Sequence, residues 1–130
     1  KRSELPRALF LVATFSRGYW WHHDSTVTLG ELLAERGETE AAVEQFRFAS
    51  WLDVNDAEAL RLIAALRFRQ NRFEEARAAQ QRAVSRQPDE PRQYKFLAQI
   101  LSAMGRDAEA QGVIAKLADL RSLATGPVAN

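Results

Sequence analysis

The sequence predicts an all-α protein, a right-handed α-solenoid of helix–turn–helix repeats. Residues that favour turns recur every 34 positions, at Gly37, Asn71 and Gly105. Five positions after each turn comes an alanine, at Ala42, Ala76 and Ala110. A fixed period of this length is the sequence signature of stacked supersecondary units.

The spacing has a physical cause. A turn between antiparallel helices needs a residue that tolerates the left-handed backbone conformation, as Gly and Asn do. Small residues at fixed points allow two helices to approach closely, while larger residues fill the grooves between them. One hairpin cannot bury its apolar face alone, so we expect successive hairpins to stack.

The pattern resembles the tetratricopeptide repeat, whose signature is W-x2-L-G-x2-Y, then A-x3-F, then P. The resemblance covers residues 23–123. The first unit carries Thr26, Leu29, Gly30, Leu33, Ala42 and Phe46, with Val54 at the proline position; the second carries Leu60, Ile63, Ala64, Arg67, Ala76, Gln80 and Pro88; the third carries Tyr94, Leu97, Ala98, Leu101, Ala110 and Ile114, with Ser122 at the proline position.

Three tetratricopeptide-like repeats are therefore expected at 23–56, 57–90 and 91–123, after a leading helix and aromatic junction at 1–22 and before a flexible tail at 124–130. The helices are expected near 4–17, 25–36, 39–53, 56–70, 73–86, 90–104 and 107–122.

Each repeat helix has its own start signal and apolar face. Asp24 or Ser25 is expected to cap the first, and Asn55, with Glu58 three residues on, to open the third. Asp89 or Glu90 should cap the fifth, after Pro88 has ended the helix before it and with Pro91 in its first turn. Helical spacing places these side chains in the core of the first hairpin: Val27, Leu29, Leu32, Leu33, Val43, Phe46, Ala49 and Leu52.

Composition limits the function classes. A chain of 130 residues with 46% hydrophobic and 27% charged residues is long enough for one soluble domain. Its net charge of +1 gives no reason to expect nucleic acid. The absence of cysteine excludes disulfides and thiol chemistry, and is compatible with cytoplasm or periplasm. The preference for Arg and Ala suggests a bacterial source.

Residues 1–22 leave two interpretations open. The apolar run 9–13 is far too short to span a membrane, and Lys1 and Arg2 could begin a signal peptide, although no small-x-small cleavage site follows. Alternatively, Ala8 aligns with Ala42, which favours the second helix of a truncated unit. The start at Lys1 instead of Met suggests a processed form or a fragment, so membrane association would require sequence upstream of residue 1.

The segment 18–23 is rich in aromatic residues. Trp20 and Trp21 are adjacent, and neighbours on a helix point in different directions, so one is expected to pack inside and the other to remain partly exposed. An aromatic plug is one interpretation. A second surface for a ligand or a membrane interface is the other.

No residue pattern predicts catalysis or a cofactor. His22 and His23 diverge on a helix, and with Asp24 they lack a third histidine or a cysteine to complete a zinc site. Ser25 follows His23 and Asp24, but contiguous residues seldom form an oriented triad. Glu74 and Glu75 have the spacing of a solvated helix face.

The resemblance implies a concave groove lined by the first helix of each unit. The residues expected there include Glu31 and Glu35 in the first unit, Arg61, Phe68 and Arg69 in the second, and Arg92, Lys95 and Gln99 in the third. The carboxylate clamp of some family members is not expected, because Val27, Glu31 and Leu62 stand where its Lys and Asn residues belong.

Charge favours an acidic partner for the basic end of this groove. Residues 23–56 hold 8 acidic and 2 basic side chains, whereas 57–90 and 91–130 each have a net charge of +2. We expect a protein–protein interaction module that binds an acidic segment with one apolar side chain against Phe68. The alternative is a non-catalytic domain of a larger membrane-associated enzyme or complex.

The last expected helix carries more apolar residues than one neighbour can cover: Val113, Ile114, Leu117, Leu120 and Leu123. A terminal unit needs a polar outer face. We therefore expect an apolar patch at this end, covered by the tail, a second copy or a partner domain.

Overall fold

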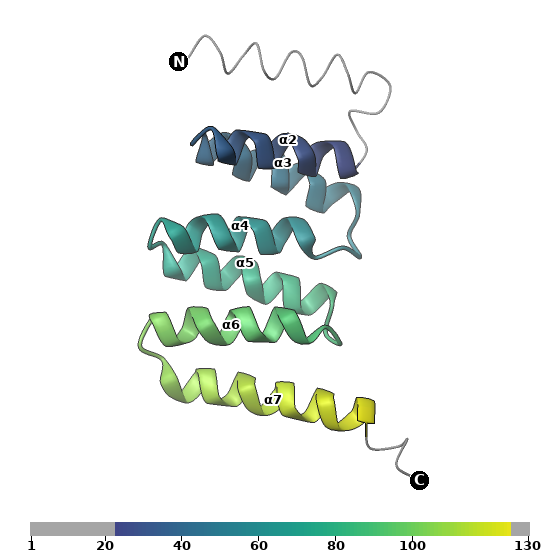
Figure 1. Cartoon of the computed structure of the whole chain (residues 1–130), viewed down its shortest axis with the longest axis vertical. Helices are drawn as coiled ribbons and strands as arrows, with labels where there is room; N and C mark the ends of the chain where they lie inside the picture. Colours follow the sequence, from purple (N-terminus) through teal and green to yellow (C-terminus); the bar gives the residue numbers. More distant parts are fainter. Residues whose placement is uncertain (1–22, 126–130) are drawn as a thin grey trace. The chain divides into compact units, whose positions relative to one another are not determined.

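The computed structural model describes residues 23–125, while 1–22 and 126–130, with the helix expected near 4–17 and Trp20 and Trp21, lie outside the described part. The described residues form helices joined by short turns, with no strand among them (Figure 1). The helices are α2 (His23–Glu35), α3 (Thr39–Leu52), α4 (Glu58–Arg69), α5 (Phe73–Arg86), α6 (Pro91–Ala103) and α7 (Asp107–Thr125).

The predicted repeat helices are confirmed, with shifts at their ends. α2 already begins at His23, and α7 continues to Thr125, so part of the expected flexible tail is helical. The reason for the longer α7 is local. Nothing between Ser122 and Thr125 stops a helix, and the first strong stop signals in the sequence are Gly126 and Pro127.

The three hairpin turns share one hydrogen-bonding pattern. Gly37, Asn71 and Gly105 have φ values of 82°, 62° and 77°, as predicted from their residue types. In the first turn, the Gly37 N–H donates to the Ala34 carbonyl at 3.0 Å and the Glu38 N–H donates to the Leu33 carbonyl at 2.9 Å. The same pair of bonds recurs one repeat later and again in the third turn. This is the Schellman motif, which satisfies the last carbonyls of a helix.

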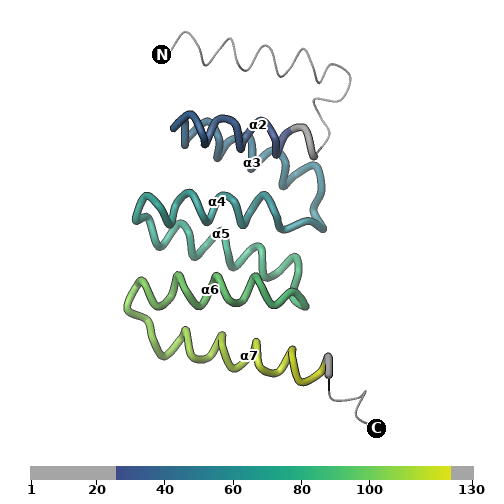
Figure 2. The backbone as a smooth tube through the Cα atoms, viewed as in Figure 1, coloured from purple at the N-terminus to yellow at the C-terminus, as the bar shows by residue number. Residues whose placement is uncertain are grey.

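Contacts divide the chain into two units, the first ending at Val54 and the second beginning at Asn55. In the first unit, α2 packs against α3. In the second, α4 packs against α5, α5 against α6 and α6 against α7, each antiparallel to the one before (Figure 2).

The core of the first unit is closed by an aromatic ring against a glycine. A Cβ atom added to Gly30 on α2 would lie 2.5 Å from a ring carbon of Phe46 on α3. Phe46 is fully buried for this reason, as the repeat pattern predicts. Two expected core residues are corrected: Leu32 is 42% exposed and Leu52 is also exposed, because each lies on the edge of its helix face.

The core of the second unit is built from residues that match the repeat. Its buried apolar side chains include Leu60, Ile63, Ala64, Ala76, Ala83, Leu97, Ala98, Leu101 and Ala110. The expected cap at Asn55 is corrected, since the Glu58 N–H donates to Asp56 Oδ1 at 2.9 Å. The expected cap at Glu90 is confirmed, because its side chain accepts from the Arg92 N–H with Pro91 in the first turn.

Candidate functional site

The α4–α6 face is a side of the second unit on which basic and aromatic residues gather. We define it by Arg61, Phe68, Arg69, Arg92, Lys95, Phe96 and Gln99. Helical spacing places the members on one side of their helices. The rings of Phe68 on α4 and Phe96 on α6 meet edge to face, with centroids 5.8 Å apart. This contact joins α4 to α6, although α5 separates them in the sequence.

Phe68 belongs to an aromatic cluster and does not stand alone. Its ring also meets Phe73 on α5, with a centroid separation of 5.3 Å and an edge-to-face arrangement. All three rings are half-buried, so each keeps an accessible edge. Edge-to-face pairs favour fixed ring positions. The cluster is therefore a pre-packed apolar platform. Sequence analysis missed Phe96, whose position next to Lys95 and one turn after Arg92 is the signal that could have indicated it.

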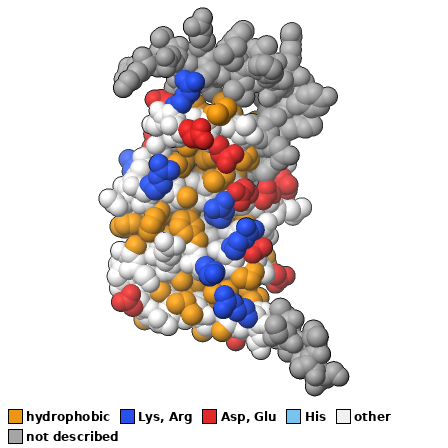
Figure 3. Space-filling view, in the orientation of Figure 1, with side chains coloured by type: hydrophobic (Ala, Val, Ile, Leu, Met, Phe, Trp, Pro, Cys, Tyr) orange, Lys and Arg blue, Asp and Glu red, His pale blue; other side chains and the backbone are white. Residues whose placement is uncertain are grey.

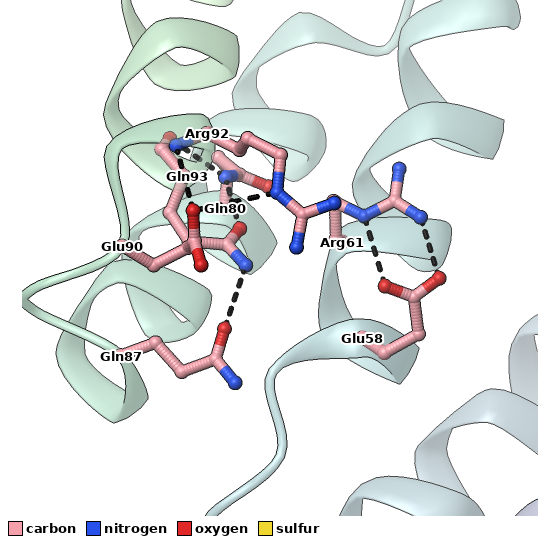
Figure 4. A network of polar contacts seen from close by, with 7 residues as sticks. All are labelled: Glu58, Arg61, Gln80, Gln87, Glu90, Arg92 and Gln93. Atoms are coloured by element: carbon pink, nitrogen blue, oxygen red, sulfur yellow. Dashed lines mark hydrogen bonds and ion pairs between the residues drawn. The ribbon is translucent and has the colours of Figure 1, made fainter.

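The basic residues of the face differ in how they are held. Arg61 makes an ion pair with Glu58 one turn earlier, at 2.5 Å (Figure 4). Arg92, whose side chain is 80% exposed, lies 3.3 Å from Glu90. Lys95 and Arg69 are exposed, and neither forms an ion pair within residues 23–125. On the face shown in Figure 3, Lys and Arg side chains lie beside exposed hydrophobic ones over the second unit.

A buried glutamine network holds the start of α6, which carries Arg92. Gln80 on α5 is fully buried, and its Nε2 donates to the backbone carbonyl of Gln93 at 2.8 Å and to its Oε1 at 2.9 Å. The Gln93 Nε2 in turn donates to Gln87 Oε1 at 3.0 Å (Figure 4). Pairing offsets the cost of burying a polar group, and it does so here for Gln80 Nε2, whereas Gln80 Oε1 has no partner within residues 23–125. The network therefore fixes α5 against α6. Tyr94 adds a bond from its hydroxyl to the Pro88 carbonyl at 2.7 Å.

The acidic half of the expected groove lies in the other unit. Glu31 and Glu35 are exposed on α2, as a groove would require. A groove that joins them to Arg61 and Arg92 would span both units, and it stays a prediction. His22 lies outside the described residues, together with the Trp20 and Trp21 surface.

Sequence analysis missed two exposed aromatic residues in the first unit, Phe48 and the far more exposed Trp51. Trp51, near the end of α3, is 82% exposed, and Val54 just beyond the helix is 62% exposed. The signal was present, because Trp51 falls outside the apolar spacing of Phe46 and Ala49.

A shallow depression of about 640 Å³ lies at the turn end of the second unit. Its charged residues are already matched: Glu74 pairs with Arg77 and lies 3.8 Å from Arg106, and Glu75 pairs with Arg67 and Arg72. The hydrogen bond from Arg77 lowers the pKa of Glu74 from its ordinary value, in spite of an opposing desolvation effect. Every charged residue that lines this depression is in an ion pair, whereas Arg69 and Lys95 of the α4–α6 face form none within residues 23–125, so the depression is the weaker candidate.

The described residues hold no cluster of three or more His, Cys, Asp or Glu side chains arranged for a metal ion. Within the same range, each helix is too short or too polar to cross a membrane.

Comparisons with known proteins indicate the fold class. No protein-family model matches the chain. The chain is 36% identical over 90 residues to the human protein O-mannosyl-transferase TMTC1. That match covers 69% of the chain but only 10% of the human protein, so the chain spans about a tenth of its curated relative.

Solved structures give a fuller match at low identity. MamA from Desulfovibrio magneticus RS-1 aligns with a TM-score of 0.72 and 18% identity, covering 92% of this chain and 67% of that one. The Yersinia enterocolitica type III secretion translocator chaperone SycD aligns with a TM-score of 0.68 and 20% identity, covering 84% and 81%. The fold is thus a tetratricopeptide-like helical repeat, and the predicted α-solenoid class is confirmed.

Proposed function

We propose that the chain is a tetratricopeptide repeat protein that serves as a protein–protein interaction module. Its α4–α6 face would bind an acidic segment of a partner that carries one apolar side chain. The observation that supports this most directly is the contact between the Phe68 ring on α4 and the Phe96 ring on α6, the helix that also carries Arg92 and Lys95.

The chemistry of the face suits such a ligand. Arginine guanidinium groups hold carboxylates in a fixed and often bidentate geometry. Arg61 and Arg92 have acidic neighbours at the surface, and exposed pairs of this kind contribute little free energy, so a ligand carboxylate can displace them at low cost. The platform of half-buried rings offers contact to an apolar side chain without a new cavity. Binding should weaken with added salt because the charges are exposed.

The test uses a labelled peptide in which Asp and Glu residues flank a single leucine, followed by fluorescence anisotropy. The double variant Arg92→Glu with Lys95→Glu should weaken binding roughly tenfold or more, since both charges reverse at the centre of the site. The matched control is Arg82→Glu with Lys116→Glu, which makes the same charge change at exposed positions on α5 and α7. Equal losses in both variants would show that only net charge matters, and would refute the site.

A second candidate function follows from the likeness to protein O-mannosyl-transferase TMTC1. That match covers a tenth of a larger enzyme. The chain could accordingly be the non-catalytic repeat module of a larger, membrane-associated enzyme or complex. Sequencing the full coding region in the source organism tests this. Flanking sequence that encodes a catalytic or membrane-spanning domain would support it, and a reading frame made only of repeats would refute it.

The C-terminal helix supports a proposal of self-association. Leu123 on α7 is 71% exposed, Ile114 is half-exposed and Leu117 is buried, so the apolar patch is smaller than the sequence suggests. We propose that Leu123, the most exposed of these side chains, meets a second copy. Sedimentation velocity should detect dimers that disappear in Leu123→Ser. A monomer at the highest soluble concentration would exclude this contact.

A further inference from the structure

The outer side of α3 carries an exposed aromatic residue in an acidic setting. By helical spacing, Glu40, Glu44, Arg47 and Trp51 share one side of this helix. The opposite side holds Phe46, which packs against α2. Trp51 therefore faces away from the hairpin core, and 82% of its surface is exposed to solvent.

The apolar surface extends beyond a single side chain. Val54 follows Trp51 by three residues and is 62% exposed. Phe48, one turn before, is also partly exposed but already has a contact of its own, so it is left out of the site. Tryptophan is the side chain most enriched at the energetic centres of protein interfaces, because a large ring area can be buried with few torsions fixed. Trp51 and Val54 together form the apolar centre of what we call the α3 face.

The charge around this centre is negative. The first repeat, 23–56, holds 8 acidic and 2 basic residues. Glu40 and Glu44 lie on the α3 face itself, where Glu44 forms an ion pair with Arg47 at 2.8 Å. By helical spacing Arg47 lies one turn before Trp51, and Glu44 and Glu40 lie two and three turns before it on the same side of α3. An electron-rich indole ring on a helix side that also carries carboxylates attracts a cation, preferably a guanidinium group that can stack on the ring.

We propose that the α3 face binds a basic amphipathic segment of a partner protein. Its Arg or Lys side chains would lie over Trp51 and toward Glu40 and Glu44, and its apolar side chains would cover Val54. This site is separate from the α4–α6 face and prefers a ligand of opposite charge.

The experiment uses two labelled amphipathic peptides with leucines along one side. One carries Arg along the other side, and its twin carries Glu at the same positions. Wild-type protein should bind the Arg peptide, with an affinity that falls as salt is added. Trp51→Ala should weaken that binding roughly tenfold or more, as expected for the central residue of an interface. The matched control is Leu32→Ala, which removes an apolar side chain that is 42% exposed on α2 and should leave this binding unchanged.

The charge contribution is tested separately. The double variant Glu40→Gln with Glu44→Gln should weaken binding of the Arg peptide by about two- to fivefold, which is the contribution expected of exposed ion pairs. Glu109→Gln with Asp119→Asn removes two acidic groups from α7 and should have no effect. Circular dichroism should show unchanged helix content, since Trp51 contributes little to the core. Arg92→Glu with Lys95→Glu should leave the Arg peptide bound, which separates this proposal from the one above.

Three outcomes would overturn the proposal. The first is equal binding of the Arg peptide by Trp51→Ala and wild type. The second is binding of the Glu peptide at the α3 face. The third is a different occupant of the α3 face, tested without any peptide present. Dimers in sedimentation, or binding to neutral phosphatidylcholine vesicles, would show such an occupant if Trp51→Ala abolished them.

Discussion

At the same position of the repeat, the first unit places Phe46 and the second places Gln80, and both side chains are fully buried. The phenyl ring needs space, which Gly30 provides by lacking a Cβ atom. The amide nitrogen needs acceptors, which Gln93 provides from the following helix, while Gln80 Oε1 has no hydrogen-bond partner among the described residues. Backbone geometry thus decides that the position is buried, whereas the residue type decides what its surroundings must supply.

The largest effect should come from the apolar side of this comparison. Phe46→Ala removes a fully buried ring and leaves a cavity, which should lower the free energy of unfolding by about 3–5 kcal/mol. Urea denaturation followed by circular dichroism measures it. A decrease in the free energy of unfolding of less than about 1 kcal/mol would be close to that of an ordinary surface substitution, and it would mean that the first hairpin does not depend on this ring.

Placing the phenylalanine of the first unit at the glutamine position of the second should also destabilise the protein. Gln80→Phe deprives Gln93 of its donor and places a ring against Ala64, which occupies the repeat position of Gly30. Overpacking of this kind costs about 1–3 kcal/mol.

Adding Ala64→Gly to Gln80→Phe should restore part of that stability, although glycine in a helix alone costs about 0.5–1 kcal/mol. Thermal unfolding of the two single variants and the double variant gives the coupling. If the double variant were the least stable of the three, the need for space would not explain Gly30.

A smaller effect is expected from Gly30→Ala. The new methyl group must displace the Phe46 ring at about 1–3 kcal/mol, partly offset by about 0.5–1 kcal/mol of helix propensity. In a Phe46→Leu background the clash disappears, and the same substitution should become neutral or stabilising. A cost that is equal in both backgrounds would show that the ring is not what excludes the methyl group.

The smallest effect is expected from a surface ion pair, Glu74 with Arg77, which serves as a reference for the effects at the buried positions. The hydrogen bond from Arg77 holds the pKa of Glu74 below its ordinary value. A carboxyl group with a lowered folded-state pKa stabilises the protein above its unfolded-state pKa, and this contribution is lost as the pH falls through the folded-state value. NMR titration should show the pKa of Glu74 rising in Arg77→Gln. An unchanged value would remove Arg77 as the cause.

Local chemistry made much of the fold predictable. The left-handed backbone of each turn requires a residue such as glycine or asparagine, and the sequence has these at Gly37, Asn71 and Gly105. The close approach of two helices requires a small residue, and the buried alanines five positions after each turn indicated it directly. The caps were less certain, because Asn55 and Asp56 are both good capping residues and only the geometry selects Asp56.

Burial of individual side chains was harder to predict, since it depends on what the neighbouring helix covers. Helical spacing placed Leu32 inside, yet it lies at the edge of the α2 face, and polarity alone would have placed the buried Gln80 outside. For the same reason, the sequence analysis did not predict the half-buried ring of Phe96 or the exposed ring of Trp51. Whether Glu31 belongs with Arg61 is a question of how two units are arranged, which no local pattern encodes.

The bonds between Gln80 and Gln93 also bear on how this protein could gain or lose copies of its repeat. Repeat arrays change length by duplication, and a new copy must fit the repeat on either side. A duplicate of 57–90 inserted after itself would bring Ala59 to the place of Gln93, so the inserted copy would meet Gln80 with a methyl group and leave a buried amide unpaired. The added copy would be accepted only if it also acquired a glutamine at the position of Ala59.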